Sequence, residues 1–189
     1  MVDSNTALRE GDAIIAVDVQ NDFCPEGSLP IENGNDVIPI LNEWFTSATR
    51  TRVLIYASRD WHPANHPSFV SEGGHWPPHC VQDSDGASFH PDLNLPDDAI
   101  IVTKGTRFDK DQYSAFDETG LAVELIKRRV HRVWVGGLAL DVCVRATALD
   151  ACEQGFEVHL IKAATRPVTP EGGSKAILEM QRAGIVIED

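Results

Sequence analysis

The sequence predicts an α/β fold: one domain spanning residues 1–189, built on an open parallel β-sheet of about six strands with helices on both faces, in the three layers of a Rossmann-like protein. Three observations support this prediction. Short apolar runs rich in valine and isoleucine recur along the chain, and stretches with helical spacing separate most of them. Strands that alternate with helices are typical of parallel sheets joined by right-handed crossovers. The length of 189 residues and the hydrophobic content of 42% suit one domain with one core.

The first strand, helix and second strand are the clearest local patterns. Residues 13–19 read AIIAVDV, a short apolar run typical of a strand that is covered on both faces. Residues 35–50 place apolar side chains at helical spacing, and Asn35 or Asp36 is expected to cap that helix. Residues 52–58 predict a second buried strand.

The rest of the chain continues the alternation after one long loop. The helix after the fourth strand is expected to begin at a polar cap, Asp141, and to end before a glycine. In chain order, the remaining predicted elements are a strand at 98–103, a helix at 121–129, a strand at 131–136, a helix at 141–154, a strand at 156–161, a helix at 171–183 and a short strand at 185–187.

Composition excludes several classes of partner. The net charge of −13 argues against nucleic acid and against an anionic membrane surface, because binding phosphate arrays requires a basic face. Residues 1–12 lack the apolar segment of a signal peptide, and no apolar run approaches the ~20 residues of a membrane-spanning helix. Cys24, Cys80, Cys143 and Cys152 form no CxxC pair, so no disulfide framework is expected and the cytoplasm is the predicted location.

Residues 59–96, after the second strand, form the most unusual segment. They hold five of the seven histidines and six of the eleven prolines, and they follow neither a helical nor a strand pattern. A loop longer than about 12–15 residues is usually functional or disordered. Two tryptophans argue against disorder, because disordered segments are poor in aromatic residues. We therefore expect an ordered loop that a metal ion holds together.

Four candidate functional residues come from four separate strand ends. Asp18 ends the first strand, Asp60 the second and Lys104 the third, and Cys143 falls in the first turn of the helix after the fourth. Ligands of open α/β sheets bind outside the carboxyl ends of the strands. The four side chains are therefore expected to converge on one rim of the sheet. Taken alone, each residue also has a purely structural interpretation: a buried thiol, a solvated lysine or an aspartate that caps a turn.

Together these groups suit amide hydrolysis by a thiol nucleophile. A helix N-terminus and a lysine both lower a thiol pKa, and Cys143 is expected to have both neighbours. Asp18 is the candidate base that accepts the thiol proton and returns it to departing ammonia. The backbone N–H groups of Ala139 and Cys143 are candidates for the oxyanion hole, since Gly136 and Gly137 permit a tight turn there.

The long loop supplies a second group of candidates. Asp60, His62 and His79 offer a carboxylate and two imidazoles, which suit one divalent ion of zinc, iron or manganese. His66 is a further candidate ligand. The plain reading, solvated loop histidines, is preferred for His75 and His90.

Five segments carry a family resemblance over nearly the whole chain. They are Val17–Phe23 (VDVQNDF), Arg59–Pro63 (RDWHP), Trp76–Val81 (WPPHCV), Lys104–Gly105 and Gly137–Val144 (GLALDVCV). With these segments the chain resembles the nicotinamidase (pyrazinamidase) branch of the isochorismatase-like cysteine hydrolases. The resemblance implies the matching open α/β fold and a metal site that other members of the superfamily lack.

The resemblance also implies roles for particular residues. Asp18, Lys104 and Cys143 would be the catalytic triad, and Asp60, His62 and His79 the metal ligands. The Leu138–Ala139 peptide bond is expected to be cis, which would place the Ala139 N–H in the oxyanion hole beside that of Cys143. Around the pyridine ring, the residues implied to bind substrate are Phe23, Trp76, Tyr113 and Leu138.

The implied activity is conversion of nicotinamide, and of pyrazinamide, to the acid and ammonia through a thioester, in NAD salvage. The ring nitrogen would lie on the metal. Three alternatives stay open: a related hydrolase of another small amide, a ureido compound or isochorismate; an iron oxygenase using Asp60, His62 and His79; and a non-catalytic metal-binding or scaffold protein. The family also leaves a homo-oligomer open.

Two departures from the usual family pattern concern the pocket. Arg107 and Phe108 stand where relatives often have a smaller turn, which is expected to alter the pocket mouth. Leu140 and Asp141 replace a common Thr-Glu or Thr-Asp pair before the nucleophile, which is expected to affect the width of the substrate site.

Overall fold

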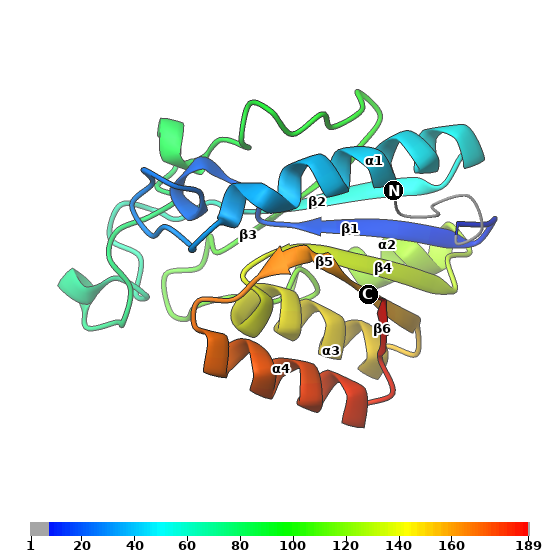
Figure 1. The fold of residues 1–189 in the computed structure, drawn as a ribbon. Helices are drawn as coiled ribbons and strands as arrows, with labels where there is room; N and C mark the ends of the chain where they lie inside the picture. Colours follow the sequence, from blue (N-terminus) through cyan, green and yellow to red (C-terminus); the bar gives the residue numbers. More distant parts are fainter. Residues whose placement is uncertain (1–7, 189) are drawn as a thin grey trace.

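The computed structural model of the chain describes residues 8–188, and it has six parallel strands in one sheet, in the order β3–β2–β1–β4–β5–β6, with helices on both faces (Figure 1). The α/β fold predicted from the sequence is confirmed. The strands are β1 (Asp12–Val17), β2 (Leu54–Asp60), β3 (Ile100–Lys104), β4 (Arg132–Leu138), β5 (Glu157–Arg166) and β6 (Val186–Glu188). The helices are α1 (Val37–Thr51), α2 (Leu121–Lys127), α3 (Arg145–Glu153) and α4 (Pro170–Arg182). The outer ends of the predicted 1–189 domain, with most of the polar N-terminal segment, lie outside the described residues.

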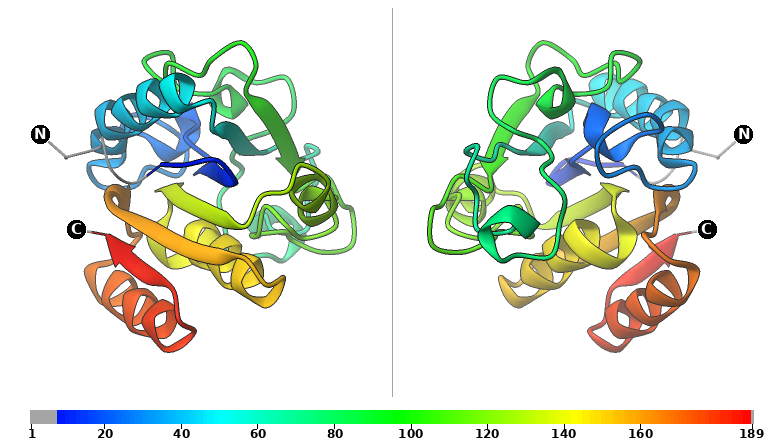
Figure 2. Two further views of the ribbon diagram at one scale, coloured as in Figure 1. Left: turned by 90° about the vertical axis from the view of Figure 1, so that its right-hand side faces the viewer. Right: turned by 90° about the vertical axis from the view of Figure 1, so that its left-hand side faces the viewer.

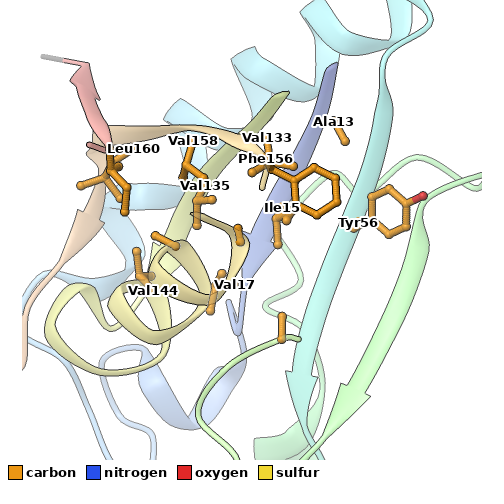
Figure 3. Close-up of a cluster of buried hydrophobic side chains, with 14 of the residues drawn as sticks. Ala13, Ile15, Val17, Tyr56, Val133, Val135, Val144, Phe156, Val158 and Leu160 are labelled. Carbon is orange, nitrogen blue, oxygen red and sulfur yellow. The ribbon is translucent and has the colours of Figure 1, made fainter. Parts of the chain in front are cut away.

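Two apolar clusters cover the two faces of the sheet. Strand β1 supplies both, because successive side chains of a strand point to opposite faces. Ile14 and Ala16 pack with α1, whereas Ile15 and Val17 pack with α2, α3 and α4. Figure 3 shows the second cluster, in which Val144 from the turn before α3 lies among strand residues. The turn that carries the candidate nucleophile is therefore anchored in the core.

The predicted helix at 141–154 is wrong in its first turn. Residues Leu140–Val144 form a π-helical turn, and α3 begins only at Arg145. The carbonyl of Ala139 accepts hydrogen bonds from the N–H groups of both Val142 and Val144, each at 3.1 Å, and this widens the turn. The predicted cap is also wrong, because the Asp141 carboxylate instead accepts the backbone N–H groups that precede α4.

The start of α1 also differs from the prediction. Neither Asn35 nor Asp36 caps it through a side chain; a 3₁₀ turn at Gly34–Asp36 leads into the helix. Strand β5 extends to Arg166, beyond the predicted end at residue 161. The other elements agree with the prediction to within about three residues, the usual scatter of element ends.

A buried ion pair joins the first and fourth strands. The carboxylate of Asp12, which is 3% exposed, accepts hydrogen bonds from Arg132 Nε at 2.8 Å and Nη2 at 2.6 Å. Trp134 Nε1 donates to the same carboxylate at 3.2 Å. The pair lies at the first hydrogen-bonded position of β1 and β4 and so fixes their register.

The long loop between β2 and β3 lies at the carboxyl ends of the strands, the edge that faces the viewer on the right of Figure 2. The buried side chain of Gln20 anchors this loop by hydrogen bonds to its backbone. The Gln20 amide donates to the carbonyls of Asp60 and Ala87, each at 2.8 Å, and its oxygen accepts the Asp60 N–H. The loop is ordered, as expected from its aromatic content. Within residues 8–188, the structure has no helix that is both long and apolar enough to cross a membrane.

Candidate active site

The four candidate residues converge at the carboxyl edge of the sheet, as predicted. Asp18 directly follows β1, Asp60 ends β2, Lys104 ends β3, and Cys143 lies in the π-helical turn after β4. All four are at least 94% buried. Strand order reverses between β1 and β4, which is where open α/β sheets place their ligands.

The ammonium of Lys104 lies at the centre of the site. Its Nζ is 2.8 Å from Asp18 Oδ2, 2.7 Å from Asp60 Oδ1 and 3.6 Å from Cys143 Sγ. Burial alone would lower the pKa of Lys104, but the two carboxylates hold that pKa well above its ordinary value. Lys104 is therefore a permanent cation that contacts Asp18, the thiol of Cys143 and, through Asp60, the start of the histidine-rich loop.

Asp18 is placed and tuned by its neighbours. Its backbone is left-handed, with φ of 49°, a conformation that aspartate tolerates better than most residues. The hydroxyl of Ser58 donates to Asp18 Oδ1 at 2.7 Å. Burial raises the pKa of the Asp18 carboxyl, and Lys104 opposes that rise. A carboxylate with a raised pKa is a better proton acceptor, which suits a general base.

The surroundings of Cys143 raise the pKa of its thiol, which differs from the expectation of a lowered pKa. Burial raises the pKa of Cys143 well above its ordinary value; Lys104 opposes this, and Asp18 adds to it. The π-helical turn supplies no compensation sufficient to reverse the direction. Attack by the sulfur therefore requires that its proton be passed to a neighbouring acceptor, and the Asp18 carboxylate is that neighbour.

The backbone before Cys143 has the expected special geometry. The Leu138–Ala139 peptide bond is cis. Gly137 has φ of +122°, and a Cβ there would lie 2.1 Å from the carbonyl oxygen of Val17 on the neighbouring strand. Only glycine fits this position, because a side chain would overlap the backbone of β1. Ala139 and Cys143, the two candidate oxyanion donors, both line the pocket described below.

Asp60, His62 and His79 form a group that fits a metal ion. Their ligand atoms all lie within 4.8 Å of one another, and all three side chains are buried. His62 Nδ1 donates to the carbonyl of Gly105 at 2.8 Å, and His79 Nδ1 donates to that of Pro77 at 2.7 Å. Both rings therefore keep the Nε2 lone pair for a ligand, an arrangement common among metal-binding histidines.

The ionised state of the Asp60 carboxylate also suits a metal ligand. Burial alone would raise the pKa of this carboxyl, but Lys104 and His62 hold it below its ordinary value. Oδ1 is engaged by Lys104, and Oδ2 faces His62 Nε2 at 3.7 Å. A carboxylate and two imidazoles are a donor set that zinc, iron and manganese all accept.

His66 lies beside this group but differs from it. It is fully buried, its ring centroid is 4.1 Å from that of His62, and its Nε2 has no hydrogen-bond partner among the described residues. Burial lowers the pKa of His66 to about 4, so the ring is neutral. A second potential metal-binding group joins His62, His66 and Asp111. His75 and His90 belong to neither group, in line with the prediction.

A pocket opens beside Cys143. It is lined by Phe23, Leu29, Ile31, Asp60, Trp76, His79, Asp111, Tyr113, Ala139, Val142, Cys143 and Val168. Trp76 Nε1 donates to the hydroxyl of Tyr113 at 3.1 Å, which links two loops at the pocket wall. Leu138 is not among the lining residues, contrary to the expectation: its side chain is fully buried in the core on the α1 side.

Several site residues were not predicted. Ser58 and Asp111 lie next to predicted residues in sequence, so their positions were a signal that could have been used. Val168 gave none, because it reaches the pocket from the segment before α4. Of the two departures from the family pattern, neither Arg107–Phe108 nor Leu140–Asp141 lines the pocket among the described residues, and Phe108 is 75% exposed.

Known proteins share this sequence family and this fold. A family model described as the isochorismatase domain matches residues 12–189. The chain is 35% identical to a nicotinamidase of Escherichia coli over 93% of each chain. It also resembles the crystal structure of a pyrazinamidase of Pyrococcus horikoshii in complex with zinc, with a TM-score of 0.92 and 46% identity over 95% of this chain and 99% of the other.

A second solved structure carries a pyridine ligand. A protein from L. infantum, solved in complex with nicotinate, matches with a TM-score of 0.89 and 37% identity over 97% of this chain and 96% of the other. Because a family model matches nearly all described residues and a relative 35% identical is covered over 93% of its length, the chain belongs to the isochorismatase family.

Proposed function

We propose that this protein is a nicotinamidase, an amidohydrolase that converts nicotinamide, and also pyrazinamide, to the corresponding acid and ammonia in NAD salvage. The observation that carries the proposal is the buried triad in the wall of the pocket, where Lys104 Nζ lies 2.8 Å from Asp18 and 3.6 Å from Cys143. Relatives named nicotinamidase, which align over more than 90% of the chain, support the substrate class.

The pocket suits a flat heteroaromatic amide. Phe23 and Trp76 provide aromatic faces for the ring, and Val142 and Val168 provide apolar walls. A divalent ion held by Asp60, His62 and His79 would supply a Lewis-acidic contact for the ring nitrogen. Binding the ring in this way orients the carboxamide toward Cys143, which lowers the barrier by positioning.

Acylation begins with transfer of the thiol proton. Asp18 accepts the proton of Cys143, and Lys104 stabilises the resulting thiolate by its charge. The sulfur forms a bond with the amide carbon, and the N–H groups of Ala139 and Cys143 stabilise the oxyanion. The C–N bond then breaks, and ammonia leaves with the proton that Asp18 carried. A thioester on Cys143 remains.

Deacylation uses the same groups in reverse. Asp18 accepts a proton from a water molecule as the water oxygen attacks the thioester carbon. The C–S bond breaks, nicotinate is released, and the proton on Asp18 returns to the sulfur of Cys143. The site is thereby restored with no net gain or loss of protons on the protein.

The nature of the ion is proposed only as divalent. The nitrogen and oxygen donors of Asp60, His62 and His79 suit zinc, iron or manganese, and a relative solved with zinc supports the first of these.

Removal of the nucleophile tests the proposed function. Cys143→Ala is expected to abolish ammonia release from nicotinamide, while circular dichroism and thermal unfolding remain those of the wild type. Cys152→Ala on α3 is the matched control and is expected to retain full activity, since this thiol lies near the end of α3 away from Cys143 and donates to the Ala183 carbonyl. Near-normal turnover by Cys143→Ala refutes the assignment of the nucleophile.

The alternatives left open by the sequence receive no support from the relatives. Hydrolysis of ureido compounds or isochorismate, oxygenation and a purely structural role are each unsupported by the nicotinamidases that match the chain. A panel of amides and ureido compounds scored for ammonia release, with oxygen uptake followed in parallel, separates these activities.

We further propose that the protein acts as one domain over residues 1–189, with the metal-binding loop at 59–96, in the cytoplasm. The net charge of −13 supports the absence of nucleic-acid and membrane partners. A homo-oligomer is compatible with the proposal, and light scattering of the purified protein measures it.

A further inference from the structure

Asp111 is a pocket carboxylate that the reaction scheme above does not use. It lies on the loop between β3 and α2, its ligand oxygen is within 4.8 Å of the ring nitrogens of His62 and His66, and its side chain lines the substrate pocket. One oxygen accepts the Gln112 N–H at 2.9 Å.

No cation within residues 8–188 pairs with Asp111. The two basic residues of the same loop, Arg107 and Lys110, form ion pairs with other carboxylates (Asp109, Asp117 and Glu118). A carboxylate at a partly buried position without a basic partner is costly unless another positive charge compensates it.

The charges of the site identify that partner. Asp18, Asp60 and Lys104 are buried together and, when all three are ionised, carry one net negative charge; His62 and His79 keep Nδ1–H on backbone carbonyls, so each ring is neutral when its Nε2 binds an ion. A divalent cation bound there would leave one positive charge uncompensated in a buried site. The Asp111 carboxylate, whose oxygen lies within 4.8 Å of a ring nitrogen of His62, carries a negative charge that would balance it.

His66 has the opposite hydrogen-bond pattern from His62 and His79. Its Nδ1 receives the backbone N–H of Ser68 at 3.3 Å, and Ser68 Oγ lies 2.7 Å from the same nitrogen. Both contacts are satisfied only if Nδ1 is unprotonated, so hydrogen-bond partners assign the ring proton to Nε2. An Nε2–H cannot coordinate a metal, but it can donate to a carboxylate. This buried Nε2 has no hydrogen-bond partner among the described residues, Asp111 included, although an Asp111 oxygen lies within 4.8 Å of a His66 ring nitrogen.

We propose that Asp111 is the charge-balancing carboxylate of the metal site and that His66 is its positioning residue: its Nε2–H, unpartnered among the described residues, would donate to Asp111 once the ion is bound, rather than His66 binding the ion. This inference rests on the proposed metal site at Asp60, His62 and His79. His66, which the sequence offered as a candidate metal ligand, would then be one of the residues that surround the ligands without binding the ion. Such outer groups typically contribute about 10–100-fold to metal affinity.

Zinc affinity, measured by competition with a chromophoric chelator, tests the role of Asp111. Asp111→Asn is expected to bind Zn²⁺ about 10–100-fold more weakly than the wild type. Asp109→Asn is the matched control: it removes an exposed carboxylate from the same loop and is expected to leave the affinity unchanged. If Asp111→Asn binds Zn²⁺ as tightly as the wild type, the inference is overturned. If the wild type itself takes up no Zn²⁺, the proposed metal site fails as well.

The visible spectrum of the Co²⁺-loaded protein tests the role of His66, because its band positions and intensities report the ligand set. His66→Gln is expected to retain the wild-type spectrum while its affinity falls, and His66→Gln/Asp111→Asn is expected to bind no more weakly than Asp111→Asn alone. A changed spectrum for His66→Gln would identify His66 as a ligand and overturn its positioning role. Neither reading depends on turnover of nicotinamide.

Discussion

Asp18 and Cys143 each have a pKa displaced upward by burial. A thiol that is neutral at rest resists oxidation and adventitious metal binding, and it becomes nucleophilic only when a base accepts its proton. The base must therefore be held within reach at all times. Ser58 and Lys104 hold it from two sides.

Ser58→Ala is expected to lower kcat for nicotinamide by about 10-fold, because the Ser58 hydroxyl holds the Asp18 carboxylate in position and a hydrogen bond to a charged group contributes roughly 1.5–3 kcal/mol. Loss of the donor also raises the pKa of Asp18, because the Ser58 hydroxyl favours the charged carboxylate. The base form is then lost at a higher pH, so the acid limb of the kcat/KM profile moves upward. Ser174→Ala on α4 serves as the control. An unchanged pH profile for Ser58→Ala would show that Ser58 does not tune the base.

At the scale of elements, the ends of β2 and β3 bring the metal-binding loop against the triad. Gly105, directly after β3, allows this close approach. Its φ is +69°, and a Cβ there would lie 2.5 Å from His62 Cε1 and 2.7 Å from His62 Nδ1. The His62 ring therefore rests on the Gly105 backbone, whose carbonyl accepts its Nδ1–H.

Chelation is expected to abolish ammonia release from the wild type, and added divalent ion to restore it. Gly105→Ala is expected to need at least 10-fold more ion for the same recovery, on the scale found for changes in the shell around metal ligands. Gly120→Ala is the matched control, because Gly120 also has a positive φ, +80°, but a Cβ there meets nothing within 4 Å. Equal ion requirements for the two variants would show that only backbone conformation matters at Gly105. Full activity of the metal-free wild type would show that the ion is not needed for ammonia release.

At the scale of the whole molecule, the site depends on the docking of β1 beside β4, and the Asp12–Arg132 pair fixes that docking at the opposite edge of the sheet. Arg132→Ala leaves a buried carboxylate without its partner and is expected to lower the free energy of unfolding in urea by about 3–5 kcal/mol. Arg145→Ala breaks a similar two-bond pair with Glu179 that is largely exposed, and is expected to cost about 0–1 kcal/mol. Equal midpoints for the two variants would contradict the importance of burial.

The sequence was sufficient to predict what depends on local patterns. Strand order in the chain and the positions of Asp18, Lys104 and Cys143 at strand ends follow from apolar runs and motifs. The contact of Val168 with the pocket depends on segments that meet only in the folded protein, and the tautomer of His66 depends on the folded geometry of its contact with the nearby Ser68. The π-helical turn was missed because its residues have an ordinary helical pattern and the widening arises at one carbonyl, that of Ala139.

The sheet order has a consequence for biosynthesis. The ion-binding side chains come from one short stretch, residues 60–79, whereas the attacking sulfur and its base come from opposite halves of the polypeptide and meet only across β1 and β4. Contacts between distant segments form late, because the chain must first close a long loop. A ribosome-bound nascent chain can thus gather its ion-binding groups early, yet it gains chemical competence only after the second half of the protein has emerged.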